Sequence, residues 1–364
     1  MNERVAAFSQ WLKNEQIDNA IITSPDHVFY FSGYFTDPHE RLLAMVFFPD
    51  EEPFLLLPQM EAETAKESGV AYPLIGYFDT DHPWDLLEKE IQRRISTPKR
   101  IAIEKSHMNV GRYEKLKHLF PEADITSAEE KLQSLRVIKD HEELKKLEKA
   151  AELADYAIKV GVDAIREGIT ELELVALIEY EMKKKGVHKM SFDTTVLVGK
   201  NAANPHGTPG LHKVKKGDFV LFDLGVIYEG YCSDITRTVA FGEVNEKHLK
   251  VYNTVLKAQE EALLKTRPGI TCSELDEVAR SIIREACYGS YFTHRLGHGL
   301  GISIHEYPSV TGTNPLPLKE GMVFTIEPGI YIPGEIGVRI EDDVYVTDDG
   351  AISLTKYPKE LIIL

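Results

Sequence analysis

The stretch FVLFDLGVIYEGYCSDITRTVAF, residues 219–241, decides the fold of the second half of this chain. It is rich in β-branched and aromatic residues and is broken near its middle by Glu229–Gly230, which predicts a β-hairpin with a two-residue turn. With the turn placed there, Asp223 faces Thr236. Because side chains alternate between the two faces of a strand, Asp223 and Asp234 become diagonal neighbours on one face, roughly 7–8 Å apart at the backbone.

Two carboxylates in a run that is otherwise patterned for burial repel one another unless a cation or a proton lies between them. The alternative is a pair of surface acids in an ordinary hairpin. The apolar residues around the two acids favour burial instead: Leu221, Phe222, Leu224, Val226 and Ile227.

Length, charge and composition limit the functions that the chain can have. A length of 364 residues is typical of two or three domains. The net charge of −16, from 42 basic and 58 acidic residues, argues against nucleic acid or an anionic membrane as a partner. No apolar run approaches the ~18 residues that span a bilayer, and the first residues lack the apolar core of a signal peptide. Three scattered cysteines predict no disulfide framework, so a reducing cytoplasm is the expected location.

The chain as a whole predicts an α/β protein of two domains. Helical and strand-like segments alternate over residues 1–127, with helices expected at 3–16, 59–68, 83–95 and 108–119 and strands at 18–23, 42–48, 53–57, 71–76 and 100–104. From residue 128 the sequence becomes charged and helical, with a long helix from about Asp140. We therefore expect an N-terminal domain over 1–127 and a second domain over 128–364.

The second domain contains an internal repeat. EGITELELVALIEYEMKKKGV (167–187) matches PGITCSELDEVARSIIREACYG (268–289), and the acidic segments DITRTV and EDDVYV follow at a similar offset. Such self-similarity predicts two similar halves packed about a pseudo-two-fold axis, each with a hairpin that contributes acids to a shared centre.

The second half completes a candidate metal site. Its strands carry Glu327 and Glu341, and the run LGHGLGISIHE between the two hairpins carries His298. Four carboxylates and one histidine suit two Mn²⁺, Co²⁺ or Zn²⁺ ions held by bridging oxygens. A dinucleotide-binding loop is the competing interpretation of the glycines, but their G-x-G-x-G spacing does not fit that motif.

The motifs DLG, SDITRT, GHGLG with IHE, IEPGIY and VRIEDD together resemble the pita-bread metallopeptidases, which include methionine aminopeptidase, proline aminopeptidase and prolidase. The first domain is similar to the N-terminal domain of prolidase and creatinase. The resemblance implies that Asp223 binds one metal, that His298 and Glu327 bind the other, and that Asp234 and Glu341 bridge the two.

The resemblance also implies roles in catalysis. Glu327 would accept the proton of the attacking water. His206 would hydrogen-bond the tetrahedral intermediate and help to protonate the leaving nitrogen. His305 would contact the carbonyl oxygen or the leaving residue. The alternatives are an ordinary loop histidine for His206 and, for His305, a histidine that only supports another side chain.

The large first domain favours the proline-directed branch of the family, because methionine aminopeptidases commonly lack it. His294 matches a histidine of the proline-specific members, and Arg295 and Arg339 suit the free carboxylate of a dipeptide. For Arg339, the alternative is that it pairs only with the metal-site carboxylates. We therefore expect an Xaa-Pro dipeptidase that uses two metal ions, Mn²⁺ first. The alternatives are an Xaa-Pro aminopeptidase acting on longer peptides, a creatinase-like hydrolase without metal, and a non-catalytic binding module.

The segment FYFSGYFTDPHERLL (29–43) is a candidate lid. Its Asp37 and His39 would reach a substrate pocket, including that of the neighbouring subunit in an expected homodimer; the alternative is a plain surface loop. Cys232 lies two residues before Asp234 and is expected to pack in the core rather than to bind metal.

Overall fold

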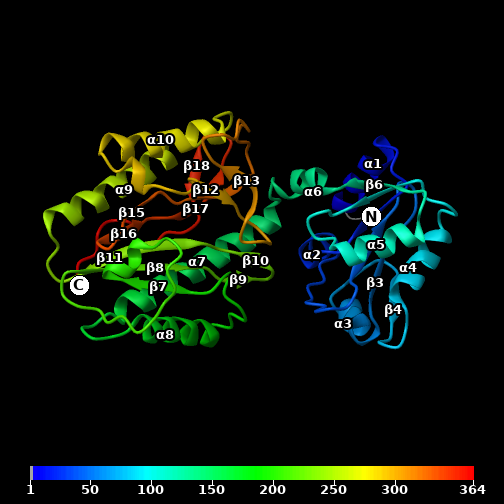
Figure 1. Cartoon of the computed structure of the whole chain (residues 1–364), viewed down its shortest axis with the longest axis horizontal. Helices are drawn as coiled ribbons and strands as arrows, with labels where there is room; N and C mark the ends of the chain where they lie inside the picture. Colours follow the sequence, from blue (N-terminus) through cyan, green and yellow to red (C-terminus); the bar gives the residue numbers. More distant parts are fainter. Residues whose placement is uncertain (1–2) are drawn as a thin grey trace. The chain divides into compact units, whose positions relative to one another are not determined.

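The computed structural model describes residues 3–364 and separates into two compact units, which meet in sequence between Arg136 and Val137. Each unit is described by itself (Figure 1). Within residues 3–364, no helix combines the length and the apolar composition that crossing a membrane requires.

The N-terminal unit is built around a six-stranded sheet in the order β4-β3-β2-β1-β5-β6. The strand pairs β1–β5, β5–β6 and β3–β4 are parallel, and β1–β2 and β2–β3 are antiparallel. Its strands are β1 (Asn19–Ile22), β2 (Ala44–Phe47), β3 (Phe54–Pro58), β4 (Leu74–Tyr77), β5 (Arg100–Ile103) and β6 (Asp124–Ser127). Its helices are α1 (Glu3–Asn14), α2 (Pro25–Ser32), α3 (Ala62–Glu67), α4 (Pro83–Gln92), α5 (Val110–Leu119) and α6 (Glu129–Arg136), with a 3-10 turn, η1, at Gln59–Glu61.

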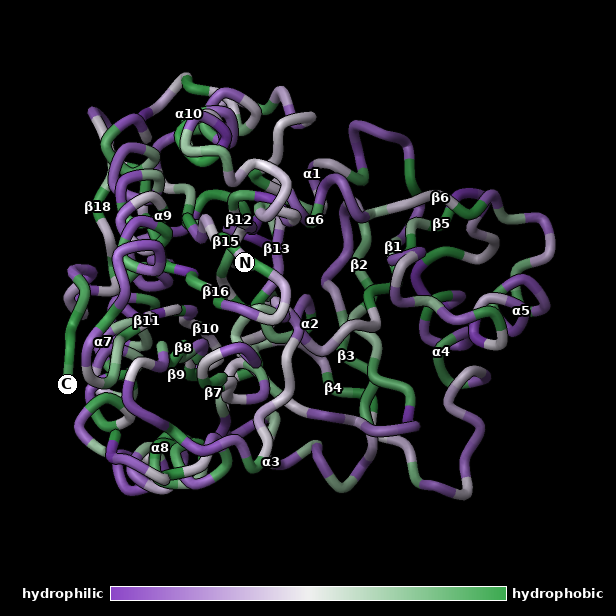
Figure 2. Tube along the Cα trace, turned by 60° about the vertical axis from the view of Figure 1, so that its left-hand side comes forward, coloured by the Kyte–Doolittle hydropathy of each residue, from purple (hydrophilic) through white to green (hydrophobic). Residues whose placement is uncertain are grey.

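Neighbouring residues of β2 serve opposite faces of this sheet, as alternation along a strand requires. Val46 joins an apolar cluster with Trp84 and Leu87 of α4. Phe47 points to the other side, where its ring lies 4.9 Å from that of Phe8 in α1. The sheet is therefore covered on both faces, and β2 and β3 are largely green in the hydropathy colouring of Figure 2.

The second unit is layered, with its helices outside and its strands between them (Figure 1). The helices are α7 (His141–Asp163), α8 (Glu171–Lys184), α9 (Glu246–Lys265) and α10 (Cys272–Glu285). Helices α8 and α10 begin with the same capping box, Thr170 with Glu173 and Thr271 with Glu274. In each box the threonine side chain accepts from the backbone amide of the glutamate, and the glutamate side chain accepts from the backbone amide of the threonine. The matching caps reflect the sequence repeat.

The strands of the second unit form several small antiparallel sheets, in the orders β11-β8-β7, β13-β12-β14-β17-β18, β10-β9 and β15-β16. They are β7 (Thr195–Val198), β8 (Asp218–Leu224), β9 (Ile227–Tyr228), β10 (Tyr231–Cys232), β11 (Ile235–Phe241), β12 (Gly297–Gly299), β13 (Glu306–Val310), β14 (Val323–Ile326), β15 (Gly329–Ile332), β16 (Ile336–Arg339), β17 (Asp342–Val346) and β18 (Ala351–Ser353). Two 3-10 turns, η2 (Gly199–Ala203) and η3 (Gly289–Tyr291), complete the unit.

The hairpin predicted from residues 219–241 has the expected register. Asp223 in β8 pairs with Thr236 in β11. The turn residues Glu229 and Gly230 both have positive φ, 46° and 83°, as a tight hairpin turn of this kind requires. The ladder is interrupted just before Ile235, and Asp234 lies in that interruption.

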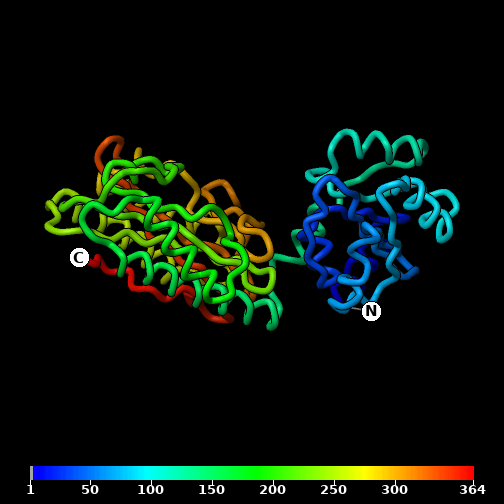
Figure 3. The backbone as a smooth tube through the Cα atoms, turned by 90° about the horizontal axis from the view of Figure 1, so that it is seen from below, coloured from blue at the N-terminus to red at the C-terminus, as the bar shows by residue number. Residues whose placement is uncertain are grey.

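The two halves of this unit join at their acidic segments. An isolated antiparallel bridge pairs Thr236 of the first half with Glu341 of the second. The C-terminal residues return to the first half, where the amide of Leu364 donates to the carbonyl of Ala240 at 3.0 Å. Figure 3 shows this red segment beside the green first half.

In the N-terminal unit, one helix and one strand were missed from the sequence. Helix α2 has eight residues, and its last four, FYFS, fall within the segment 29–43 that was interpreted as a candidate lid or surface loop, because their rings favour β structure. Its first turn is capped by Ser24, whose side chain accepts from the amide of His27. Strand β6 is short and polar, so no apolar run marks it. Helix α6 belongs to the N-terminal unit, nine residues beyond the boundary expected at 127/128.

Candidate metal centre and active site

A cavity of about 440 Å³ in the second unit is lined by all five predicted metal-binding residues. Asp223 lies near the end of β8, Asp234 just before β11, His298 on β12, Glu327 just after β14 and Glu341 just before β17. Strand termini and breaks therefore supply the ligands, since there a side chain can leave the pleat and turn inward.

His298 is held as a neutral imidazole with a free nitrogen. Its Nδ1 donates to the carbonyl of Gly299 at 3.1 Å, which leaves the lone pair of Nε2 unused. Burial, and after it the charge of the nearby His305, lower the pKa of His298 to about 3. Its Nε2 lies 3.6 Å from Asp234 Oδ2 and 3.4 Å from Glu327 Oε1. A lone pair facing two carboxylates without a proton between them is a geometry that a cation would stabilise.

The backbone around His298 is packed too tightly for side chains. A Cβ on Gly297 would lie 1.8 Å from the carbonyl oxygen of Thr325, and one on Gly299 would lie 2.3 Å from that of Tyr307. Both glycines are therefore needed for close strand packing at the histidine.

The carboxylates carry more negative charge than the protein around them balances. Burial raises the pKa of Asp234 and of Glu341 well above the ordinary range, and mutual repulsion within the cluster adds to both shifts. Burial also raises the pKa of Glu327 to about 7, although Arg339 opposes it. In the part of the chain that the structure describes, the buried oxygens Asp223 Oδ1 and Asp234 Oδ1 have no hydrogen-bond donor. Buried carboxylate oxygens normally have such a partner, so these two atoms are open to a cation.

The ligand set fits divalent cations. One atom each of Asp234, His298 and Glu341 lie within 4.8 Å of one another and can converge on a single ion. Asp223 and Glu327 line the same cavity, which adds two more carboxylates. Carboxylate oxygens with one imidazole nitrogen suit Mn²⁺, Co²⁺ or Zn²⁺, and positive charge would relieve the repulsion that raises the carboxyl pKa values.

Two residues hold the carboxylates in place. Thr236, fully buried, donates from Oγ1 to Glu341 Oε2 at 2.6 Å. Arg339 donates to Thr236 Oγ1 at 3.0 Å through Nε, to Tyr331 at 2.8 Å, and to Asp223 Oδ2 through its third nitrogen. Each nitrogen of this guanidinium thus donates one hydrogen bond inside the protein, which ties Arg339 to the carboxylate cluster.

Both predicted catalytic histidines line the cavity and remain accessible. His305 is exposed, and its ring meets that of His298 edge to face at 4.2 Å. His206 is also exposed, in the loop between η2 and β8. This loop is fastened by the fully buried carboxylate of Glu171, which accepts from the amides of Val198 and Gly210, both at 2.7 Å.

His294 lines the cavity with neither ring nitrogen free. Its Nδ1 donates to the carbonyl of Arg295 at 2.8 Å, and its Nε2 accepts from the Tyr331 hydroxyl at 2.9 Å. Burial lowers the pKa of His294 to about 4 and Arg339 adds to that shift, so the ring is neutral at neutral pH. A substrate would therefore meet a carbon edge or a face of this ring. Tyr331 gave no signal in the sequence beyond an ordinary strand pattern.

Arg295 is the remaining predicted cation at the cavity. It is half-buried, and within residues 3–364 its guanidinium makes a single hydrogen bond, a long one of 3.4 Å to Ser309 Oγ. Asp37 and His39 belong to the N-terminal unit, where their side chains are 78% and 72% exposed. Neither is among the residues that line the cavity of the second unit. Cys232 is buried, and its thiol donates to the carbonyl of Ile302.

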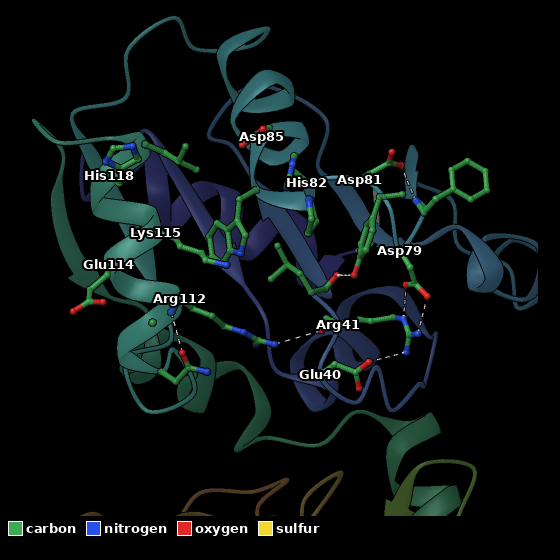
Figure 4. A pocket seen from close by; sticks show the side chains of 18 residues that line it. Glu40, Arg41, Asp79, Asp81, His82, Asp85, Arg112, Glu114, Lys115 and His118 are labelled. Carbon is green, nitrogen blue, oxygen red and sulfur yellow. Dashed lines mark hydrogen bonds and ion pairs between the residues drawn. The ribbon is translucent and has the colours of Figure 1, made fainter.

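A larger cavity, of about 1060 Å³, lies in the N-terminal unit between α4 and α5 (Figure 4). It contains none of the residues predicted for catalysis or metal binding. Its Arg41 is held by Asp79 through two hydrogen bonds, and Arg112 donates to the carbonyl of Arg41 at 3.3 Å. The larger cavity is therefore not the one that contains the predicted metal ligands and catalytic residues.

The fold and the acidic centre together define a class of protein. Residues 145–348 match metallopeptidase family M24, and residues 4–138 match the creatinase/prolidase N-terminal domain. The chain belongs to metallopeptidase family M24. The predicted class of enzyme and the predicted α/β fold, with a creatinase-like first domain and a pita-bread second domain, are confirmed.

Individual relatives come from the prolidase and aminopeptidase branches. YkvY of Bacillus subtilis (strain 168), provisionally named a dipeptidase, is 52% identical over 361 residues, which cover 99% of each chain. The prolidase of Pyrococcus horikoshii OT3 is 38% identical, with a TM-score of 0.92 over 99% of this chain and 100% of its own. The X-Pro aminopeptidase of Thermotoga maritima MSB8 is 33% identical, with a TM-score of 0.87 over 96% and 98%.

Proposed function

We propose that this metallopeptidase hydrolyses the Xaa-Pro bond of dipeptides and uses two divalent metal ions, Mn²⁺ in first place and Co²⁺ or Zn²⁺ as alternatives. The observation that carries the proposal is the neutral His298 whose free Nε2 faces the carboxylates of Asp234 and Glu327 at 3.6 and 3.4 Å. The prolidase-like relatives support the choice of substrate.

The five ligands divide between the two metal positions. Asp223 would hold one ion, His298 and Glu327 the other, and Asp234 and Glu341 both. When bound, divalent ions at such a centre make a water molecule more acidic and polarise a carbonyl oxygen. Thr236 and Arg339 keep Glu341 and Asp223 in place for this purpose.

The protein's own groups move the protons. Glu327, which accepts from Thr325 Oγ1 at 3.3 Å, is placed to take the proton of the attacking water. His206 is accessible at the mouth of the cavity, where it can donate to the developing oxyanion and pass a proton to the prolyl nitrogen. This nitrogen carries no hydrogen in the peptide and needs a proton to leave. His305 is placed to contact the carbonyl oxygen or the leaving proline.

The preference for dipeptides rests on the cations. Arg339 is held by Thr236, Tyr331 and Asp223, whereas Arg295 makes one long hydrogen bond to the described residues, so we assign the carboxylate of a bound Xaa-Pro dipeptide to Arg295. Aminopeptidase activity on longer peptides is the second candidate, since the Thermotoga relative is named an X-Pro aminopeptidase. In a homodimer, the loop with Asp37 and His39 would act as a lid on a substrate site.

The test is a substrate panel with controlled metal content. Metal-free protein is loaded with Mn²⁺, Co²⁺ or Zn²⁺ and assayed on Xaa-Pro, Xaa-Pro-amide and Xaa-Pro-Yaa. We expect hydrolysis of the dipeptide acid above the other two, and its loss on chelation. Equal efficiency on all three would reject the dipeptidase in favour of the aminopeptidase. Activity that survives complete metal removal would reject the metal centre.

A further inference from the structure

Helix α10 carries a partly buried ion pair, Asp276 with Arg280, that the proposed mechanism does not use; the Arg280 side chain is 28% exposed. Arg280 donates to Asp276 twice, from Nε to Oδ2 at 2.6 Å and from a terminal nitrogen to Oδ1 at 2.8 Å. Asp276 is 1% exposed. The same helix has an ordinary surface pair, Arg284 with Glu277, in which both side chains are more than half exposed. Burying a charged side chain such as Asp276 costs free energy, whereas an exposed pair such as Arg284–Glu277 does not. The burial of Asp276 therefore indicates that the Asp276–Arg280 pair supports more than its own helix.

The Asp276–Arg280 pair continues into the irregular segment that leads to the metal site. Arg280 donates to the carbonyls of Phe292, at 3.1 Å, and His294, at 2.9 Å. Asp276 Oδ1 accepts from the amide of Leu296 at 3.2 Å. The guanidinium also lies 4.3 Å from the centre of the Phe292 ring. Residues 292–296 belong to no helix or strand, so these side chains replace the backbone partners that regular structure would provide.

This segment carries two residues of the substrate cavity, His294 and Arg295. The Phe292 ring that Arg280 covers lies edge to face against the His294 ring, at 5.0 Å between centres. The carbonyl of His294 accepts from Arg280, and the carbonyl of Arg295 accepts from the His294 ring. The pair therefore fixes the main chain from which both cavity residues project.

The end of the segment nearest the metal ligands is held independently. The amide of Leu296 also donates to the carbonyl of Val310 at 3.0 Å, and its carbonyl accepts from the amide of Glu327 at 2.8 Å. Without Arg280, His294 and Arg295 would lose their support, whereas Leu296 would keep two backbone bonds. The pair thus acts on the substrate side of the cavity and not on the metal side.

We infer that Asp276 and Arg280 are positioning residues for substrate recognition: from behind the cavity they set the place of His294 and Arg295, and so the fit of the prolyl end of the substrate. This inference rests on the proposed function. According to this inference, helix α10 influences substrate specificity although it does not line the cavity, because it positions the lining residues His294 and Arg295.

The test compares three variants in the metal-loaded enzyme. Arg280→Met keeps most of the side-chain volume but loses every donor, and we expect kcat/KM for Xaa-Pro to fall about 10- to 100-fold, chiefly through KM. Bound metal, measured by elemental analysis, should stay at the wild-type level. Arg280→Lys restores a positive charge beside Asp276 but not the planar fork that reaches two carbonyls, so it should recover melting temperature without recovering KM. Arg284→Met, on the same helix, should change neither.

Opposite results would overturn the inference. They are a wild-type KM in Arg280→Met, full kinetic recovery in Arg280→Lys, or a loss of activity that follows lost metal or lowered folded fraction. If Arg280→Met does not fold, Asp276→Asn is measured in the same way, because it keeps the shape and weakens the pairing. Failure of the proposed function is recognised separately, because the wild type would then not prefer Xaa-Pro dipeptides in the substrate panel. In that case the variants are compared on the peptide that the wild type cleaves best.

Discussion

Replacing Arg295 with methionine should change which peptides the enzyme prefers. Arg295 is the cavity cation with the fewest hydrogen bonds to the protein, a single long one to Ser309, whereas each nitrogen of Arg339 already donates one. A charge-assisted hydrogen bond to the substrate carboxylate contributes about 1.5–3 kcal/mol. At about 1.4 kcal/mol per tenfold, Arg295→Met should lower kcat/KM for Xaa-Pro by roughly 10- to 100-fold.

The ratio of efficiencies on Xaa-Pro and Xaa-Pro-amide is the quantity to measure. Burial raises the pKa of Glu327, and Arg339 and then Arg295 oppose that shift. Removing Arg295 can therefore slow the chemistry on every substrate, but that effect cancels in the ratio. We expect the wild type to favour the acid and Arg295→Met to treat acid and amide alike. A wild-type preference that persists in the variant would refute the carboxylate contact, and equal wild-type efficiencies would refute it at the outset.

Three further changes test the centre and the N-terminal unit. Asp223→Asn or Glu341→Gln should nearly abolish hydrolysis and reduce bound metal, which elemental analysis would reveal; full occupancy with full activity would contradict the ligand assignment. His206→Ala should keep its metal and lose about 10²–10⁴-fold in kcat, whereas a change in KM alone would make it a substrate-binding residue. Although Glu104 is buried, hydrogen bonds led by that of His27 lower its pKa from 4.5 to about 2. Because the folded pKa is the lower one, Glu104→Gln should lose roughly 2–3 kcal/mol of unfolding free energy above pH 4.5, and the difference from wild type should shrink as pH falls towards 2; a pH-independent difference in urea midpoints would reject the electrostatic cause.

Local patterns in the sequence were sufficient for the elements whose residues repeat regularly. The register that pairs Asp223 with Thr236 followed from alternation and from the turn at Glu229–Gly230, both of which are properties of neighbouring residues. The repeat of 167–187 in 268–289 likewise corresponds to two helices with matching N-terminal caps, α8 and α10. Short segments that mix polar and aromatic residues were predicted less well: part of α2 was interpreted as a loop, but the structure has a helix there.

The contacts that adjust the site were not visible in the sequence. Glu171 and Asp276 lie on amphipathic helices, where an acid is normally a solvated residue, yet both are buried and hold cavity loops. Arg339 was considered for the substrate carboxylate or the metal-site carboxylates, and two of its three partners, Asp223 and Thr236, lie more than 100 residues away in sequence. Contacts between residues so far apart in sequence depend on how the two halves of the second unit pack, and the local sequence pattern of one half does not determine that packing.

The shared origin of the ligands in two halves has a consequence for how the protein melts. Asp234 and Glu341 stand 107 positions apart in the chain, so an ion bound by both acts as a cross-link that closes a long loop. Because unfolding separates these residues and releases the ions, metal would stabilise the folded second unit by mass action while leaving the N-terminal unit, which holds none of the ligands, untouched. In calorimetry we expect one unfolding transition to rise with metal loading and the other to stay where it is. The gap between them would report how firmly the ions tie the two halves together.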